Sequence, residues 1–503
     1  MAWFALIALG HVVVRVAVSP ALKWDEAEQI LWTQDLLAGY GPQPPLYTWL
    51  QWCFNAVFGS GVLALALLKH MLLALAYGLM FCAARVVLGP RAAFWAAAGM
   101  SLIPALGWFS VRDQTHTVLV TTLACGAWWL FVRVIEQPQP ARFAALGLVC
   151  GLGMLAKYNF ALFAGTLWLA ALSVEQTRRA LLARGWWWMF VIAALVVLPH
   201  ALWLLDHLQM ASGETLQKMN IQPEVPLLTG LVRLAEKWFG SVLLWALALL
   251  AVFGRALWRR PAMAARPAGQ QWLARVGWRY LALVMLVLMG LVLVAHVSNF
   301  KDRWLLPLMC GVPLLTLAWR PELDQHPRGQ RLTGALAAFA LIALAAAGIR
   351  PWLTGQKGTE PDELNHPARE LAAALAAQGY DGAGRIIGAD HMLAGMLRSR
   401  FPNARAAACN IDHTAIEPCV TAQTRLAEQA GEGWLLISRA DRLNPDWWPQ
   451  TLAALGCSAA TCRMRTVMLP FHMVGPEMPP AQYQFIWRAA APAQPPLAKG
   501  APQ

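Results

Sequence analysis

Long apolar runs separated by short polar segments dominate the first 350 residues of the chain. A helix needs about 17–25 apolar residues to cross a bilayer, and most of the runs approach or reach this length. We therefore predict membrane-spanning helices at eleven places: 3–18, 62–84, 92–110, 115–134, 142–156, 159–174, 186–205, 239–258, 278–298, 303–319 and 332–349. The two runs within 142–174 are short, and Lys157 separates them.

The pattern changes beyond residue 350, where apolar and polar residues mix. Strand-like runs occur at 384–388 and 433–438, and helical patterns occur at 367–378 and 391–399. Alternation of this kind is typical of a small α/β domain. The chain is therefore expected to consist of a helical transmembrane domain (1–349, with short amphipathic helices in a first outer loop, 19–60), an α/β domain (350–490) and a disordered tail rich in Ala, Pro and Gln (491–503).

Composition supports a polytopic membrane protein. The chain has 503 residues, of which 58% are hydrophobic and only 13% are charged, whereas a soluble domain carries roughly 25% charge. A net charge of +13 could suggest a nucleic-acid partner. The basic residues fall between apolar segments, however, so we expect the bilayer as a partner and no nucleic acid.

Arginine clusters recur in alternate loops, and most acidic residues of the membrane part lie in the other loops. The positive-inside rule then places the N-terminus in the cytoplasm, and eleven spans place the C-terminal domain outside. A cleaved signal peptide is the alternative for residues 1–18. That segment lacks a positive start, Arg15 interrupts it, and Val18-Ser19-Pro20 is a poor cleavage site, so we predict a retained first span.

The cysteines are consistent with an outer C-terminal domain. Five of the nine lie in apolar segments, and the other four form close pairs in the tail, Cys409 with Cys419 and Cys457 with Cys462. Close pairs in an oxidising compartment predict disulfides. A zinc site is the alternative, but neither pair has C-x-x-C spacing and no histidine brackets them.

The first outer loop begins with adjacent acids, Asp25 and Glu26, at the start of an expected helix over 26–38. A carboxylate at a helix N-terminus can simply cap the helix. Capping accounts for one acid and not for two. Two acids at a membrane surface can also accept a proton from a hydroxyl, or hold a divalent cation that bridges a phosphate. The residues alone leave both readings open.

A stiff, proline-rich turn over residues 40–47 follows this helix, with Tyr40, Gln43 and Tyr47 among its members. Three prolines there restrict the backbone. Trp and Tyr are common at the bilayer interface of any membrane protein. They are also residues against which a sugar or a lipid headgroup could stack.

These motifs together resemble the first outer loop of bacterial GT-C glycosyltransferases. Asp-Glu-Ala at 25–27, a Trp-centred helix, and Tyr-Gly-Pro-Gln-Pro-Pro-Leu at 40–46 carry the resemblance. The group concerned is family 39, which contains dolichyl-phosphate-mannose–protein mannosyltransferase-like and aminoarabinose-transferase-like proteins. Many members have Asp-His where this chain has Pro42-Gln43. The resemblance implies a GT-C fold of about 11–13 transmembrane helices.

Two further segments match this family. Val-Arg-Asp-Gln-Thr-His at 111–116 lies where the family has a second acid, and Asp113 aligns with that acid. A cluster of Arg112, Asp113 and His116 at the mouth of a membrane helix is costly unless it is paired or functional. His116 alone would more often be a satisfied interfacial histidine.

Residues 151–160, which contain Lys157 and Tyr158, resemble the family's Gly-x-x-x-x-Ser/Thr-Lys-Tyr turn. An outer lysine at this depth suits a lipid-borne phosphate, although it could also snorkel to the interface. Arg303 begins another span on the outer side. It could be anchored by Asp302, or it could hold the donor phosphate.

The reaction implied by the resemblance is an inverting transfer of a sugar from a polyprenyl-phosphate donor to a lipid, glycan or protein acceptor. It would take place at the periplasmic side of a bacterial inner membrane. Asp25 would be the leading base, with Glu26 as partner or rival and Asp113 as the second acid. Arg112, Lys157 and Arg303 would bind the phosphate, and Asp25, Glu26 and Asp113 could hold a divalent metal.

A transporter or flippase of a lipid-linked sugar is the alternative from another class. Such a protein should carry ionisable groups near helix midpoints or show repeated halves. Here the candidate groups gather at the ends of spans, with Arg15, Lys69 and His70 as exceptions, and no internal repeat is evident. A non-catalytic assembly scaffold is a third reading, and it would tolerate loss of the acids.

Overall fold

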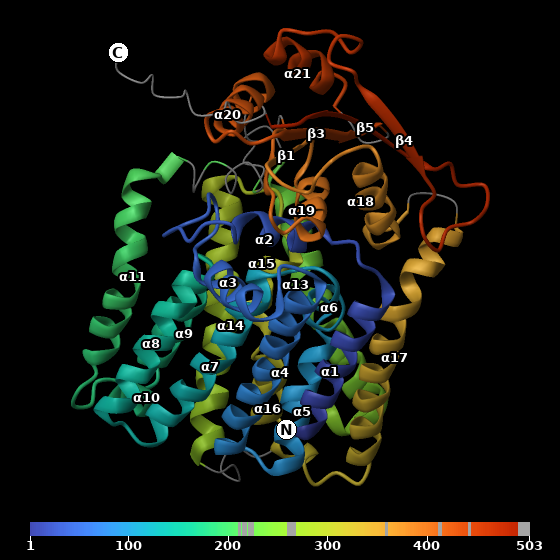
Figure 1. Ribbon diagram of the computed structural model, residues 1–503. Coiled ribbons are helices and arrows are strands. Elements are labelled where there is room, and N and C mark those ends of the chain that lie inside the picture. Colours follow the sequence, from blue (N-terminus) through green and yellow to red (C-terminus); the bar gives the residue numbers. More distant parts are fainter. Residues whose placement is uncertain are drawn as a thin grey trace, which may run out of the picture. The chain divides into compact units, whose positions relative to one another are not determined.

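The computed structural model describes residues 1–209, 213, 219, 226–258, 268–357, 361–410, 415–440 and 444–490 (Figure 1). The tail over 491–503, expected to be disordered, lies outside the described residues. The chain divides into two compact units. The helical unit comprises 1–13, 36–50 and 66–347, and the sheet unit comprises 14–35, 51–65 and 348–503.

Helices account for most of the first 356 residues. In chain order they are α1 (Ala2–Val18), α2 (Trp24–Trp32), α3 (Leu46–Phe58), α4 (Val62–Val87), α5 (Pro90–Ala98), η1 (Gly99–Leu102), η2 (Ala105–Phe109), α6 (Ser110–Arg112), α7 (His116–Glu136), α8 (Pro140–Ala156), α9 (Phe160–Leu172), α10 (Glu175–Leu181), α11 (Trp188–Asp206), α13 (Leu227–Phe253), η3 (Gly254–Trp258), α14 (Ala268–Ala295), α15 (Asp302–Met309), α16 (Val312–Trp319), η5 (Pro321–Leu323) and α17 (Gly329–Gln356).

Every predicted span falls on helical structure. Among the described residues, six helices are long and apolar enough to cross a membrane, and eight are if each of two bent pairs counts as one span. Two predicted spans are broken rather than continuous. Residues 92–110 bend by 71°, because Ile103 precedes Pro104 and is extended. Residues 303–319 form the separate helices α15 and α16, which part at Cys310 and Gly311.

The sheet unit contains a five-stranded mixed sheet. Its strands are β1 (Arg385–Gly388), β2 (Arg405–Ala408), β3 (Trp434–Arg439), β4 (Arg465–Leu469) and β5 (Ala481–Arg488), and their order is β2-β1-β3-β5-β4. β1 pairs in parallel with β2 and β3, whereas β5 runs antiparallel to both of its neighbours. The two strand-like runs in the sequence are β1 and β3, so the α/β prediction is confirmed.

Helices cover both faces of this sheet (Figure 1). They are η6 (Glu363–Asn365), α18 (Ala368–Ala377), α19 (His391–Arg400), α20 (Ile416–Gln429) and α21 (Trp447–Leu455). One core packs α18 and α19 against Ile386, Leu435 and Phe485, while a second packs α20 and α21 against Ile387 and Leu436. Alternate residues of β1 and β3 therefore face opposite layers, as strand geometry requires.

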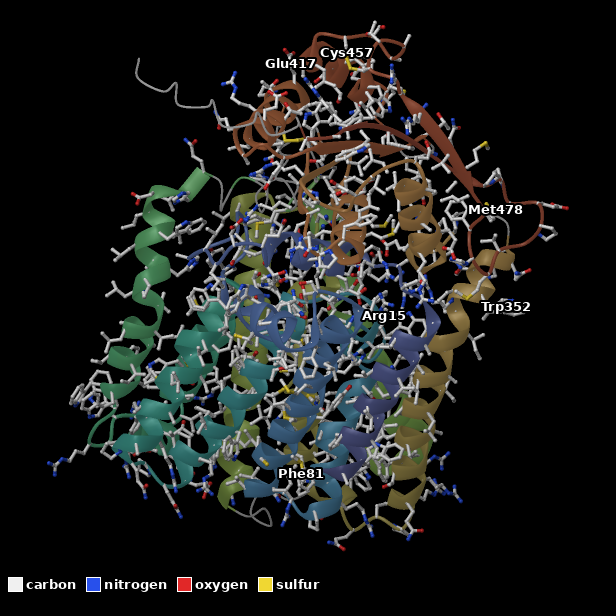
Figure 2. All side chains as sticks on the ribbon, in the orientation of Figure 1. Arg15, Phe81, Trp352, Glu417, Cys457 and Met478 are labelled. Carbon is white, nitrogen blue, oxygen red and sulfur yellow. A yellow bond between two sulfur atoms is a disulfide. The ribbon has the colours of Figure 1, made fainter. Side chains whose placement is uncertain are left out.

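Two disulfides lie in the sheet unit, at the positions that the spacing predicts. Cys409 is bonded to Cys419 and Cys457 to Cys462, with Cα–Cα distances of 5.6 and 6.0 Å. The sulfur atoms at Cys457 are visible in Figure 2. These bonds link α20 to the end of β2 and close the turn after α21. Each short loop restricts the unfolded chain, which favours the folded domain.

The expected helix over 26–38 ends earlier than predicted. α2 ends at Trp32, because the Thr33 hydroxyl donates back to the carbonyls of Gln29 and Ile30 at 2.8 and 3.3 Å. Such side-chain hydrogen bonds compete with the backbone hydrogen bonds of the helix. The residues after Thr33 therefore leave the helix and form a turn.

Candidate active site

The backbone around Asp113 is irregular. It passes from a π-helix, η2, through one turn of α-helix, α6, to Asp113, which has non-helical backbone angles (φ −143°, ψ −149°). Gln114 then adopts a φ of 62°, a left-handed conformation that costs a non-glycine residue on the order of 1–3 kcal/mol. π-Helical insertions and strained residues gather at functional sites. The buried Oδ1 of Asp113 accepts no hydrogen bond from the described residues.

Cations lie around this acid in the helical unit. Lys157 donates from Nζ to the Thr117 hydroxyl at 2.8 Å, which brings it to the first turn of α7. Arg112 lies over the Trp108 ring, 5.5 Å from its centroid. Lys69 is 1% exposed and donates to the Arg112 carbonyl at 3.4 Å. The end of α6 is therefore a positively charged environment.

Arg303 belongs to the same region of the helical unit. Asn159 donates to the Trp304 carbonyl at 3.0 Å, which places the start of α15 beside the turn between α8 and α9. Asp302 pairs with Lys237 at 3.0 Å rather than with Arg303, so the anchoring alternative for Arg303 is wrong.

Tyr158 takes part in a chain of hydrogen bonds. Its hydroxyl lies 3.1 Å from Nε2 of His200, and Nδ1 of His200 lies 2.7 Å from the carbonyl of Ala38. Burial raises the pKa of Tyr158 to about 12, so its hydroxyl stays protonated at neutral pH. His200 thus ties the turn after α8 to the first loop.

The proline-rich turn is folded as a tight hairpin. Tyr40 and Gln43 exchange backbone hydrogen bonds of 3.0 and 3.1 Å, and Gly41 adopts a φ of 58°, which glycine tolerates best. The Tyr40 side chain is 4% exposed, and its hydroxyl accepts from the Leu37 amide. Tyr47 is 1% exposed and contacts the His116 ring at 5.3 Å between centroids. Both tyrosines are therefore packed inside, and Gln43 is more accessible.

An apolar pocket lies in the helical unit, next to α6. Residues of α1, α4, η1, η2 and α17 contribute to its lining. His11 and His70 stack at its wall with centroids 5.4 Å apart. Val111 of α6 also lines it, so the pocket borders the segment that leads to Asp113.

The adjacent acids Asp25 and Glu26 lie in the sheet unit and differ in environment. Glu26 is 2% exposed. Arg15 donates to its two oxygens at 3.1 and 2.5 Å, and the Lys23 amide donates at 3.0 Å. Asp25 is only partly buried. Glu26 is thus a fixed structural acid, and Asp25 is the more accessible of the two.

The suggested metal set does not fit this arrangement. Both carboxylate oxygens of Glu26 already accept hydrogen bonds from protein donors. Within the part of the chain that the structure describes, no three His, Cys, Asp or Glu side chains gather as a metal site. We therefore derive no step through a metal.

Sequence reasoning did not assign roles to Lys69 and His200. A lysine inside an apolar span is itself a signal of function, and Lys69 is such a residue. His200 follows Pro199 inside α11, and only the folded chain shows its link to Tyr158.

Comparisons with known proteins identify relatives of this chain. Residues 42–203 match the family described as dolichyl-phosphate-mannose–protein mannosyltransferase. The lipopolysaccharide core galacturonosyltransferase RgtB of Rhizobium johnstonii is 32% identical over 471 residues, which cover 91% of this chain and 92% of that protein. RgtA of the same organism, also described as a lipopolysaccharide core galacturonosyltransferase, is 32% identical over 78% of each chain.

Solved structures share the fold. ArnT from Cupriavidus metallidurans in the apo state superposes with a TM-score of 0.60 at 15% identity, covering 96% of this chain and 97% of that one. The same protein bound to undecaprenyl phosphate gives a TM-score of 0.59 at 14% identity, with the same coverage. From the length and identity of the match to RgtB, the chain belongs to the family of membrane glycosyltransferases that contains RgtA and RgtB.

Proposed function

We propose that this glycosyltransferase moves a galacturonosyl group from a polyprenyl-phosphate carrier to the core or lipid A part of a lipopolysaccharide. The observation that carries the proposal is the presence of cationic side chains near Asp113, in a chain that matches a galacturonosyltransferase over nearly its whole length. A nucleotide-sugar donor has less support, because the sequence contains no Gly-rich phosphate loop.

A lipid-borne donor suits the helical unit. Its apolar pocket would accept part of a hydrocarbon chain, since apolar side chains from several helical segments line it. The same pocket borders α6, and the Arg112 carbonyl at the end of α6 accepts a hydrogen bond from Lys69 of α4. A phosphate at that end would meet positive charge, while the chain stays in an apolar environment.

The sugar would add a second anion. A sugar-phosphate diester carries one negative charge and a uronic acid carries another. Lys157, Arg303 and Arg112 provide three cations in the helical unit, which exceeds the need of one phosphodiester. We propose that the additional positive charge binds the uronate carboxylate, because bidentate arginine contacts suit carboxylates as well as phosphates.

The chemistry is a displacement at the anomeric carbon. A bond forms from the acceptor oxygen to that carbon while the bond from the carbon to the phosphate oxygen breaks, so the configuration inverts. A base takes the acceptor proton, and cations neutralise the leaving phosphate. We assign the base to Asp25, because Glu26 is engaged by Arg15 and by the backbone. Asp113 is the second acid, which would orient a sugar hydroxyl.

We also propose that the sheet unit lies on the periplasmic side of the inner membrane. Its two disulfides favour an oxidising compartment. The test is labelling of Cys409, Cys419, Cys457 and Cys462 in intact cells by a thiol reagent. Labelling only after reduction supports this location, and labelling without reduction contradicts it.

The function is tested by mass spectrometry of lipopolysaccharide from a deletion strain complemented with variants. Wild type should restore a hexuronic acid, while Asp25→Asn and Asp113→Asn should not. Asp446→Asn is the matched control, because Asp446 is an exposed acid of the sheet unit. The purified enzyme should then transfer galacturonic acid from its polyprenyl phosphate to the lipopolysaccharide of the deletion strain.

Unchanged lipopolysaccharide in the deletion strain would refute the acceptor. Normal turnover of Asp25→Asn by purified protein would refute the base. A flippase would instead move the donor across vesicles without transferring its sugar, so the purified reaction also separates the two classes.

A further inference from the structure

The sheet unit holds the helix that carries Asp25 through contacts on several sides. Helix α2 packs against α19, and at the closest point the backbones touch. A Cβ added to Gly395 would lie 2.4 Å from the Ala27 carbonyl oxygen and 2.8 Å from its carbon. Only glycine permits this approach, because the obstacle is backbone and cannot rotate away. Leu22, Ile30 and Met392 form an apolar cluster at the same contact.

A buried group of charges fixes the start of α2. Lys23 pairs with Asp362, and its ammonium also lies 3.1 Å from Glu363. Arg350, near the end of α17, pairs with the other oxygen of Asp362. The side chains of Lys23 and Asp362 are 5% and 4% exposed. Buried charges of this kind hold one geometry, because any displacement leaves a charge unpaired.

The end of α2 is tied to the sheet as well. The Gln34 amide accepts from the Ala406 backbone amide at 2.7 Å and donates to the Ala406 carbonyl at 2.8 Å. Ala406 belongs to the edge strand β2, so the side chain continues the ladder of the sheet. The start, middle and end of α2 are therefore each attached to residues between 350 and 406.

We propose that the C-terminal α/β domain is a positioning element for catalysis, which sets the place of Asp25 through Gly395 and Asp362. This inference rests on the proposed role of Asp25 as the base. Neither residue touches substrate in this view. Each acts through α2, because Gly395 sets the approach of the helix and Asp362 fixes Lys23 at its N-cap.

Two variants break different contacts. Gly395→Ala introduces a methyl group against the Ala27 backbone without changing any charge. Asp362→Asn removes the carboxylate that Lys23 and Arg350 share, at nearly constant volume, while Glu363 stays next to Lys23. The controls are Gly290→Ala, at a helical glycine with open space around its Cβ position, and Glu428→Gln, at an exposed ion pair of the same domain. Both test variants must remain monodisperse in detergent.

Turnover and hydrogen exchange are measured on the full-length purified enzyme. Misplacement of a catalytic group by about 1 Å can reduce the rate on the order of 100-fold. We expect kcat to fall about 10- to 100-fold in both test variants, with the donor KM within about threefold, because the proposed donor contacts lie in the helical unit. We also expect amides of residues 24–32 to exchange at least tenfold faster, and both controls to behave as wild type.

The outcomes separate this inference from the proposed function. If kcat and exchange of 24–32 stay at wild-type values in both test variants, the positioning role is wrong. It is also wrong if kcat falls while exchange in α2 is unchanged. If Asp25→Asn keeps normal turnover, the base assignment fails instead, and the exchange data still report whether the domain fixes α2.

Discussion

The ion pair between Arg15 and Glu26 provides a strong test of the arrangement around α2. Arg15 lies in the last turn of α1 (Figure 2), and it makes four hydrogen bonds. Two go to Glu26, and the others reach the carbonyls of Ser19 and Ala21 at 2.8 and 2.7 Å. The side chains of the pair are 7% and 3% exposed. Replacing Arg15 by Met would leave a buried carboxylate without its counter-charge.

The size of the effect follows from this burial. Removing one partner of a buried ion pair costs about 3–5 kcal/mol, mainly because the other charge stays desolvated. The double variant Arg15→Met/Glu26→Gln removes both charges, and the introduced carboxamide oxygen can still accept from the Lys23 amide. We expect the double variant to lose less stability than Arg15→Met alone, with a coupling of about 2 kcal/mol.

The assay is unfolding of the purified protein in mixed micelles, followed by tryptophan fluorescence, together with sugar transfer. Arg179→Met is the control, because Arg179 pairs with Glu175 on an exposed surface, with side chains 78% and 64% exposed. Such a pair contributes about 0.5 kcal/mol or less. The double variant should also keep turnover, because Glu26 is a structural acid in our assignment.

Two results would refute this reasoning. If the losses of Arg15→Met and Glu26→Gln simply add in the double variant, the two side chains do not form a coupled buried pair. If the double variant is folded but cannot transfer sugar, Glu26 takes part in the chemistry, and the assignment of the base to Asp25 alone is wrong.

Three other changes test separate parts of the site. Lys157→Met should lower kcat/KM for the donor about 10- to 100-fold through loss of a charge-assisted contact, whereas Lys357→Met, at an exposed lysine, should change it little. Ala340→Trp should fill the apolar pocket and raise the donor KM, while Leu341→Trp, 52% exposed on the neighbouring position of α17, should not; equal KM values would exclude the pocket as the lipid site. Burial raises the pKa of Asp362, but the Lys23 ammonium, hydrogen bonds and Arg350 outweigh it and lower the value to about 2. Because the unfolded pKa is about 3.9, this stabilisation is complete above about pH 5 and should fall by about 2 kcal/mol as the pH drops toward 2. Asp362→Asn should remove this part of the pH dependence of unfolding.

The helical architecture could be predicted because a bilayer imposes a minimum length on each apolar helix. The predicted spans overlap helices, so the pattern was a guide to helix positions, but among the described residues only six helices, or eight with the bent pairs, are long and apolar enough to cross a membrane. The pattern could not show the breaks at Ile103 and Cys310, because both lie within runs that remain apolar throughout. Local backbone geometry causes these breaks, and Pro104 imposes it in the first case. A hydropathy pattern contains no information about such geometry.

The candidate site residues could be predicted where an ionisable side chain stands in or beside an apolar segment. Asp113 and Lys157 are ionisable residues at the ends of apolar runs, and both lie in the helical unit beside further cations. The attachment of α2 to the α/β domain was not predictable. Lys23 and Asp362 are 339 positions apart, and nothing in either local sequence marks one as the partner of the other. Gly395 likewise looks like an ordinary helical glycine until Ala27 is placed against it.

Asp25 and Glu26 illustrate how adjacent residues acquire different roles. Successive side chains on a helix point about 100° apart, so two neighbouring acids point in different directions. Arg15 and the Lys23 amide engage Glu26 on the buried side of α2. Asp25 is thereby directed to a more accessible side, on a helix whose N-terminal dipole stabilises a negative charge there. The two acids thus have different roles. The buried Glu26 fixes the orientation of α2, and this orientation leaves Asp25 on the more accessible side. A variant that exchanges the two positions, Asp25→Glu with Glu26→Asp, keeps both charges but shortens the anchored side chain. We expect it to lose turnover, since the shortened carboxylate would not reach Arg15 in the same geometry, and wild-type turnover of this variant would show that the anchor is unnecessary.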